Sequence, residues 1–179
     1  GINMILVLLL YIHFPRATVP SIVFYNLHNC AAVHFIEADN SSYLCSDRKD
    51  STYIYMKNIA ETYWKRKKMP IPHLLLSDYE GRNVWSHKGI VHWRGMNICM
   101  VTDGYWRNKS ATNLLDIDYM YLCKGYKGEI APLQKLFHIK RIVLDASLGD
   151  YKSKAYKEEC KTLGLDYIDT VSYTHLTLP

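Results

Sequence analysis

The spacing of histidines decides whether this chain can hold the ions of a two-metal hydrolase. Such enzymes use an HxHxDH motif, because that spacing presents imidazoles and a carboxylate on one loop. None of the eight histidines is two positions from another, and none directly follows an aspartate. The closest pair, His87 and His92, lies in a strand-like region, where alternate pleating predicts side chains on opposite faces. The sequence therefore shows no intact metal or catalytic centre, and it predicts no cofactor.

Two aspartates are the next candidates for chemistry. Asp103 follows an apolar run and is either a metal ligand or a turn carboxylate. Asp145 ends a predicted strand, where α/β enzymes often keep functional groups. Because Ala146 and Ser147 follow it without a glycine-rich phosphate loop, we expect Asp145 to cap the next turn. The sequence contains no GxSxG, P-loop or GxGxxG motif, so the hydrolase, nucleotide triphosphatase and dinucleotide-binding functions have no motif to rest on.

A basic cluster beside an aromatic residue is the candidate nucleic-acid site. The formal charge of +5 and the pI near 8.8 are compatible with nucleic acid or an anionic membrane surface. Five consecutive residues could bind phosphates while the indole stacks on a base, namely Trp64, Lys65, Arg66, Lys67 and Lys68. The alternative is a solvated helix end, where cations complement the negative end of the helix dipole.

Length, composition and cysteine usage describe an ordinary globular domain. A chain of 179 residues fits one domain with a sizeable core, and 49% hydrophobic with 22% charged residues is typical of that class. The five cysteines are scattered, and their odd number without a CxxC pair argues against a disulfide framework or a zinc ribbon. We therefore expect them to be buried as small hydrophobes.

Both ends of the chain differ from the middle. Residues 2–14 are nearly all apolar but too few to cross a bilayer, which takes about 20 residues in helical form. We expect residues 1–15 to be a linker or the end of a truncated transmembrane helix; a buried strand or helix is the alternative. Residues 172–179 back-translate to a transposon-end sequencing adapter, so we expect 171–179 to be an artefact of a truncated metagenomic read; the alternative is a native tail.

The middle of the chain predicts a hairpin-rich sheet followed by an α/β unit. Strand-like runs are rich in β-branched and aromatic residues and are separated by turn residues, whereas helical runs repeat apolar residues on one face. We predict strands at 21–27, 32–38, 43–46, 74–76, 83–85, 90–93, 96–102, 117–122, 140–145 and from 165, and helices at 51–68, 130–138 and 150–163. The strand–helix–strand order at the end implies parallel pairing with right-handed crossovers. The fold class is therefore α/β (α+β).

Several segments resemble the C-terminal region of ComEC-type competence proteins, especially the Bacteroidetes form. Segment 22–36 corresponds to the DVGQGDA motif of that family, and segment 97–104 corresponds to a strand of the family that ends near TGD. The more specific likeness lies in three later segments, 117–125 to VDYLILS, 136–147 to FHPKQIILDGS and 156–165 to WQEECEELGI. The resemblance covers roughly residues 15 to 170.

The resemblance implies an incomplete metallo-β-lactamase-like sandwich over residues 16–170 whose metal site is degenerate. Lys124-Gly125-Tyr126-Lys127 stands where catalytic members write HHGS, and a cation in that place opposes metal binding. Asp103 alone matches a ligand position, as a relic of the metal site.

The function implied is that of a non-catalytic accessory domain of an inner-membrane DNA-uptake channel, on the periplasmic side. Its partners would be the channel domain of the same protein and, through upstream helices, the membrane, with DNA as a further candidate. Two alternatives stay open. One is a metal-dependent nuclease with an atypical site at Asp103, His87 and His92, and the other is a structural interaction domain without DNA affinity.

Overall fold

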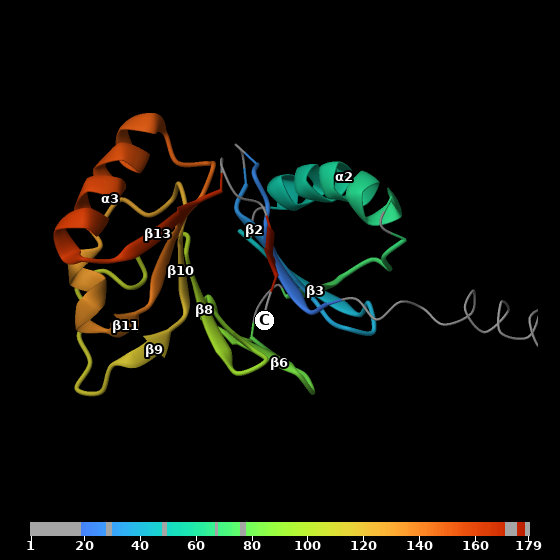
Figure 1. Ribbon diagram of the computed structural model, residues 1–179, viewed down its shortest axis with the longest axis horizontal. Helices are drawn as coiled ribbons and strands as arrows, with labels where there is room; N and C mark the ends of the chain where they lie inside the picture. Colours follow the sequence, from blue (N-terminus) through green and yellow to red (C-terminus); the bar gives the residue numbers. More distant parts are fainter. Residues whose placement is uncertain are drawn as a thin grey trace, which may run out of the picture.

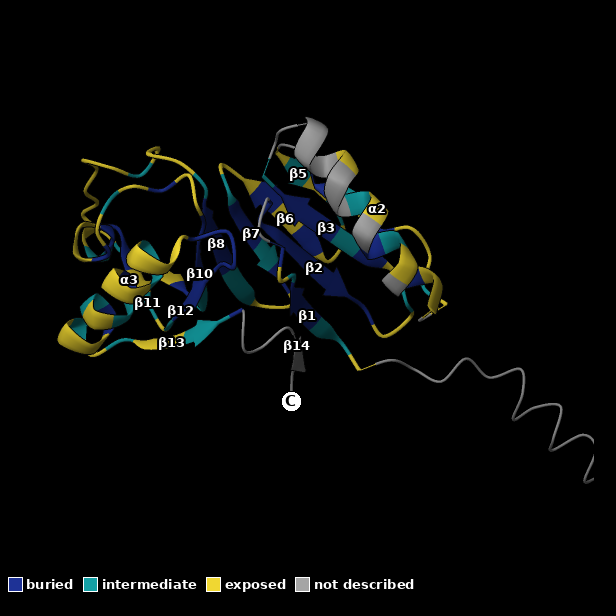
Figure 2. Ribbon diagram, turned by 90° about the horizontal axis from the view of Figure 1, so that it is seen from above, coloured by how far each residue is buried: buried dark blue, intermediate teal, exposed yellow. Residues whose placement is uncertain are grey.

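Two β-sheets face each other, and a helix covers the outer side of each (Figures 1 and 2). The computed structural model describes residues 19–27, 30–47, 50–66, 68–75, 78–170 and 175–177. The expected membrane segment at 1–15 lies outside these ranges. Within them, no helix is both long enough and apolar enough to cross a bilayer.

The first sheet has the strand order β14-β1-β2-β3-β4. Its strands are β1 (Ser21–Phe24), β2 (Ala32–Ile36), β3 (Ser42–Ser46), β4 (His73–Leu75) and β14 (His175–Thr177). The first three form an antiparallel meander, β4 is parallel to β3, and β14 is antiparallel to β1. Helix α2 (Asp50–Arg66) connects β3 to β4 and packs against the outer face of this sheet.

The second sheet has the order β13-β12-β10-β8-β7-β6-β5. Its strands are β5 (Tyr79–Glu80), β6 (Val84–His87), β7 (Ile90–Trp93), β8 (Met96–Val101), β10 (Tyr119–Leu122), β12 (Arg141–Leu144) and β13 (Asp166–Asp169). Strands β5 to β8 are antiparallel, whereas β8, β10, β12 and β13 are parallel, as the sequence predicted for the final third. Helix α3 (Asp150–Leu163) crosses from β12 to β13.

A small two-stranded sheet replaces part of the predicted α/β unit. Residues 130–138, predicted as one helix, form a 3-10 helix, η1 (Ala131–Lys135), followed by β11 (Phe137–Ile139). Strand β11 pairs in parallel with β9 (Leu115–Ile117), so the predicted strand 117–122 is also divided, at Asp118. The helix prediction was wrong because η1 is too short to gain from helical cooperativity, while pairing with β9 satisfies the backbone of the residues that follow.

Three apolar clusters hold the layers together. The central cluster, which includes Phe35, Trp93 and Tyr121, lies between the two sheets. A second, with Leu44 and Trp64, joins α2 to the first sheet, and a third joins α3 and η1 to the second sheet. The layers are therefore helix, sheet, sheet, helix. This mixed α+β sandwich confirms the predicted fold class and is consistent with a β-lactamase-like domain.

The caps of α3 refine one sequence-based expectation. Gly149 is the N-cap residue and makes no side-chain cap hydrogen bond, whereas Asp150, expected to cap the helix, is its first residue. An acidic side chain in the first turn still complements the positive end of the helix dipole. Gly164 ends the helix in the left-handed conformation, with φ of 66°, as predicted for a glycine at a helix C-terminus.

Candidate functional site

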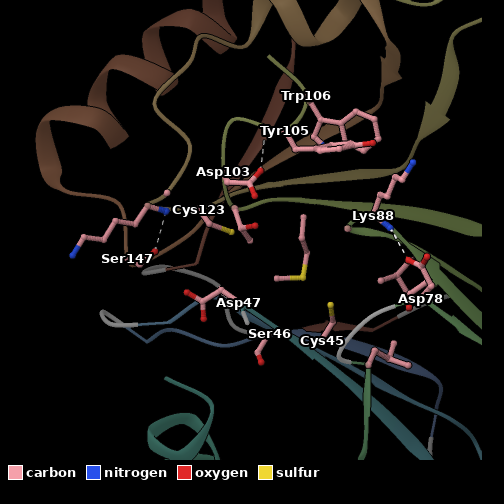
Figure 3. A pocket seen from close by; sticks show the side chains of 18 residues that line it. Cys45, Ser46, Asp47, Asp78, Lys88, Asp103, Tyr105, Trp106, Cys123 and Ser147 are labelled. Atoms are coloured by element: carbon pink, nitrogen blue, oxygen red, sulfur yellow. Dashed lines mark hydrogen bonds between the residues drawn. The ribbon is translucent and has the colours of Figure 1, made fainter. Parts of the chain in front are cut away.

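A cavity of about 920 Å³ opens where strands from both sheets end. The parallel strands β8, β10 and β12 bring their carboxyl ends to one edge of the second sheet, which is where α/β proteins place ligand sites. Figure 3 shows the residues that follow these strands around the cavity, with Asp103, Cys123 and Ser147 across from the end of β3 (Cys45 and Ser46) and from Asp47, which follows it.

A buried hydrogen-bond network braces one wall of the cavity. The Tyr121 hydroxyl and the Ser147 hydroxyl both donate to the Asp145 carboxylate, and the Ser147 amide donates to Asp145 Oδ2 at 3.0 Å. The Lys124 amide donates in turn to Ser147 Oγ at 3.3 Å. Burial raises the pKa of Asp145 to about 6 and holds the pKa of Tyr121 well above its usual value. Asp145 therefore caps the turn that follows it, as predicted, and it also fixes the backbone of Lys124.

Asp103 lines the cavity but acts on its own loop. Its Oδ1 accepts the Tyr105 amide at 2.8 Å, which is the geometry of a turn carboxylate. Asp78, on the other side of the opening, accepts the Lys88 amide at 3.3 Å and pairs with His87 Nδ1 at 2.8 Å. The role of Asp103 as a relic metal position stays a prediction.

His87 and His92 lie on one face of the β6–β7 hairpin, not on opposite faces as predicted. Lys88 and Gly89 form a two-residue turn with φ of 48° and 82°, which pairs His87 with Ile90 and Trp85 with His92. Cross-strand partners share a face, so the five-residue spacing was misread as one continuous strand.

These two histidines do not join Asp103. His92 Nδ1 lies 2.7 Å from Asn97 Oδ1, its ring stacks on Trp85, and neither histidine lines the cavity. Among the described residues, no three His, Cys, Asp or Glu side chains are placed to hold a metal ion. The three residues of the nuclease alternative are therefore not brought together.

Trp64 is part of the core, which excludes the stacking role expected for it. The residue is 2% exposed, and its Nε1 donates to the Tyr25 hydroxyl at 2.9 Å. Of its basic neighbours, Lys65 pairs with Glu61 at 2.9 Å, while Arg66 and Lys68 are exposed. Lys67 lies outside the described residues. Binding of phosphates by the described cations of this cluster stays a prediction.

The loop after β8 contains a site that sequence reasoning missed. Lys109 Nζ lies 3.2 Å from the centre of the Tyr105 ring, and Lys88 Nζ lies 5.9 Å from it. The Trp106 ring meets the Tyr105 ring edge-on, with the ring centres 4.7 Å apart, and the Phe137 ring, with the centres 5.1 Å apart. The loop is therefore anchored to the core. The available signal was the mixture of aromatic and basic residues at 105–109, since 64–68 also places an aromatic residue beside basic ones.

The five cysteines are all free and buried, as the sequence predicted. Cys45 and Cys123 face the cavity from opposite sheets. Burial holds the pKa of the Cys123 thiol well above its usual value, with the Asp145 charge adding to the effect. The Cys123 thiol is therefore held neutral, which makes it a poor nucleophile and a poor metal ligand.

Comparisons with known proteins agree with the resemblance seen in the sequence. Residues 22–176 match the family model of the ComEC C-terminal domain. Neither the curated proteins nor the solved structures contain a match. Because the family model spans most of the chain, from β1 into β14, the chain belongs to the ComEC C-terminal domain family.

Proposed function

We propose that this chain is a non-catalytic accessory domain of a DNA-uptake channel in the inner membrane, and that it contacts DNA through electrostatic and stacking interactions. Membership of the ComEC C-terminal domain family supports a role in competence DNA uptake. The non-catalytic role, the channel context, the periplasmic side and the channel domain as partner are the further steps of the proposal.

The observation that carries the proposal is the position of Lys124. The residue is exposed and lines the cavity, and its backbone is fixed by the Ser147–Asp145 network. An ammonium group there repels a divalent cation and attracts a phosphate. Lys88 lines the same cavity from the β6–β7 turn. Two lysines from two loops of the second sheet thus line the cavity, together with the carboxylates of Asp47, Asp78 and Asp103.

Cleavage of DNA is the property that separates this proposal from the nuclease alternative. The 179-residue chain would be incubated with labelled single-stranded DNA and Mn²⁺, Mg²⁺ or Zn²⁺, and the products resolved on a denaturing gel. We expect intact DNA with each ion. Metal-dependent fragments that disappear in Asp103→Ala would overturn the non-catalytic role and establish a nuclease.

The channel context has its own test in the gene. Sequencing upstream of the codon for Gly1 should reveal many hydrophobic spans in the same reading frame. A soluble enzyme domain in that position would contradict the channel role. Binding of DNA is a separate matter, because a structural domain without DNA affinity could occupy the same place in a channel.

A further inference from the structure

Tyr105 presents an aromatic ring at the mouth of the cavity. The residue is 40% exposed, although its backbone is held by Asp103 and its ring is supported edge-on by Trp106. Trp106 is itself packed on Phe137, within the cluster that joins α3 to the second sheet. The ring is therefore held in place from below while part of its surface faces solvent, as in the stacking platforms of proteins that bind single strands.

Two cations, Lys109 and Lys88, lie over this ring, and a third residue, Lys124, lines the cavity beneath it from the loop after β10. All three are exposed, and within the described residues none of them forms an ion pair with a carboxylate. Other exposed lysines of the chain do have such partners, as Lys140 has Asp118 at 2.8 Å. We call Lys88, Lys109, Lys124 and Tyr105 the cationic rim.

Two of the aspartates that line the cavity, Asp103 and Asp78, are engaged with their own loops. Asp103 accepts the Tyr105 amide, and Asp78 accepts the Lys88 amide and pairs with His87. These carboxylates order the two loops that carry the rim. Figure 3 shows Lys88, Tyr105 and Trp106 on the same side of the cavity, with the Asp103 and Asp78 bonds drawn beneath them. Neither carboxylate therefore holds a rim ammonium group, and the partner of Lys88 and Lys109 in the free protein is Tyr105 itself.

We propose that the cationic rim binds single-stranded DNA, with a nucleobase stacked on the Tyr105 ring and the flanking phosphates on Lys88, Lys109 and Lys124. The inference rests on the proposed function, since it names where that function contacts its DNA. In the free protein the Lys109 ammonium occupies the ring. A base offers a larger apolar contact than an exposed cation–π pair, so the base displaces the ammonium, which then binds a phosphate.

The chemistry favours a single strand over a duplex. Only an unpaired and unstacked base can lay its face on an aromatic ring, and the cavity below has the volume of sites that enclose one small organic group. Lysines give no sequence preference, because an ammonium group recognises phosphate as a point charge. The rim is thus suited to binding a single strand whatever its base sequence.

Fluorescence anisotropy of a labelled oligothymidylate with the 179-residue chain tests the proposal. Tyr105→Ala should weaken binding roughly 5- to 150-fold, the loss of one stacked base. Tyr105→Trp should retain the affinity, because it keeps an aromatic face. Trp85→Ala is the matched control, since Trp85 is also 40% exposed but does not line the cavity. Circular dichroism would verify that each variant is folded.

The phosphate contacts are tested by two variants that remove equal charge. The rim variant is Lys88→Ser/Lys109→Ser/Lys124→Ser, and its control, Lys65→Ser/Arg66→Ser/Lys68→Ser, neutralises the end of α2. Each phosphate contact contributes about 0.7 to the slope of log affinity against log salt concentration for a single strand, so the rim variant should lower the slope by about 2. The control variant should leave most of this slope unchanged.

The outcomes separate this inference from the proposed function. DNA binding that survives in both rim variants, or is lost equally in the α2 control, overturns the rim while the proposed DNA contact stands. Equal affinity for a duplex of the same length overturns the stacking of a base. Failure of the unmodified chain to bind any single strand overturns the DNA contact of the proposed function and the rim with it.

Discussion

The carbonyl oxygen of Thr102 lies where a side chain on residue 125 would begin. A Cβ added to Gly125 would stand 1.8 Å from that oxygen, well inside any tolerated contact. The loops after β8 and β10 therefore touch through their backbones, and glycine is the residue that permits it. This contact sets the positions of Asp103 on one loop and Lys124 on the other.

Replacement of Gly125 should show how tightly the two loops pack. Gly125→Ala is expected to lower the free energy of unfolding by about 1–3 kcal/mol, because a backbone carbonyl must move to admit the methyl group. Gly104→Ala is the control, since no heavy atom lies within 4 Å of its added Cβ. That change should be neutral or slightly stabilising. Urea denaturation gives both values, and equal stability of the two variants would contradict the close approach.

The buried carboxylate of Asp145 should make stability depend on pH. Its folded-state pKa of about 6 lies above the ordinary value of 3.8, because burial disfavours the charged form. The folded state therefore holds the proton more tightly, and the stabilisation is complete below pH 3.8 and lost as the pH rises through 6. The difference in unfolding free energy between the wild type and Asp145→Asn should change by about 2–3 kcal/mol over that window.

Chemical denaturation at a series of pH values measures this difference. The amide of asparagine does not titrate, so any constant cost of its altered hydrogen bonds cancels from the pH dependence. A difference that stays flat from pH 4 to pH 7 would show that folding does not raise the pKa of Asp145.

Glu37 should contribute to stability through two donors that reach it from β7 and the turn that follows. It is 4% exposed and accepts from Trp93 Nε1 at 2.6 Å and from Arg94 at 3.0 Å. Glu37→Ala leaves a buried indole N–H without this acceptor, at a cost of about 1–3 kcal/mol. Glu61→Ala, which breaks only the surface pair with Lys65, should cost less than about 1 kcal/mol. Trp93 is fully buried, so near-ultraviolet circular dichroism should report its disturbance in Glu37→Ala alone.

Trp64 should matter for stability and not for DNA. Trp64→Phe removes the hydrogen bond to the Tyr25 hydroxyl and should lower the free energy of unfolding by about 0.5–1.5 kcal/mol. Because the indole is buried, the affinity for an oligothymidylate should stay within the error of the anisotropy measurement. A tenfold loss of affinity in a folded Trp64→Phe protein would restore the stacking role inferred from the sequence.

The sequence predicted the layers better than it predicted the side-chain neighbours. Strands β8, β10 and β12 and helix α3 follow from local periodicity and from the glycine at 164, and the place of Lys124 follows from the family resemblance. The partner of Trp64 is Tyr25, which lies 39 residues earlier, so no local pattern could show that the indole is buried. Whether His87 and His92 share a face depends on the length of the turn between β6 and β7. A turn one residue longer or shorter would have placed the two histidines on opposite faces.

The central claim is that the cationic rim binds a single strand of DNA and leaves it intact. One time course tests it, the anisotropy of a labelled oligothymidylate after addition of the 179-residue chain with Mn²⁺ present. The account predicts a prompt rise that then stays constant and that weakens steeply when the salt concentration is increased. Either no rise, or a rise that decays with time as the DNA is cut, would contradict it.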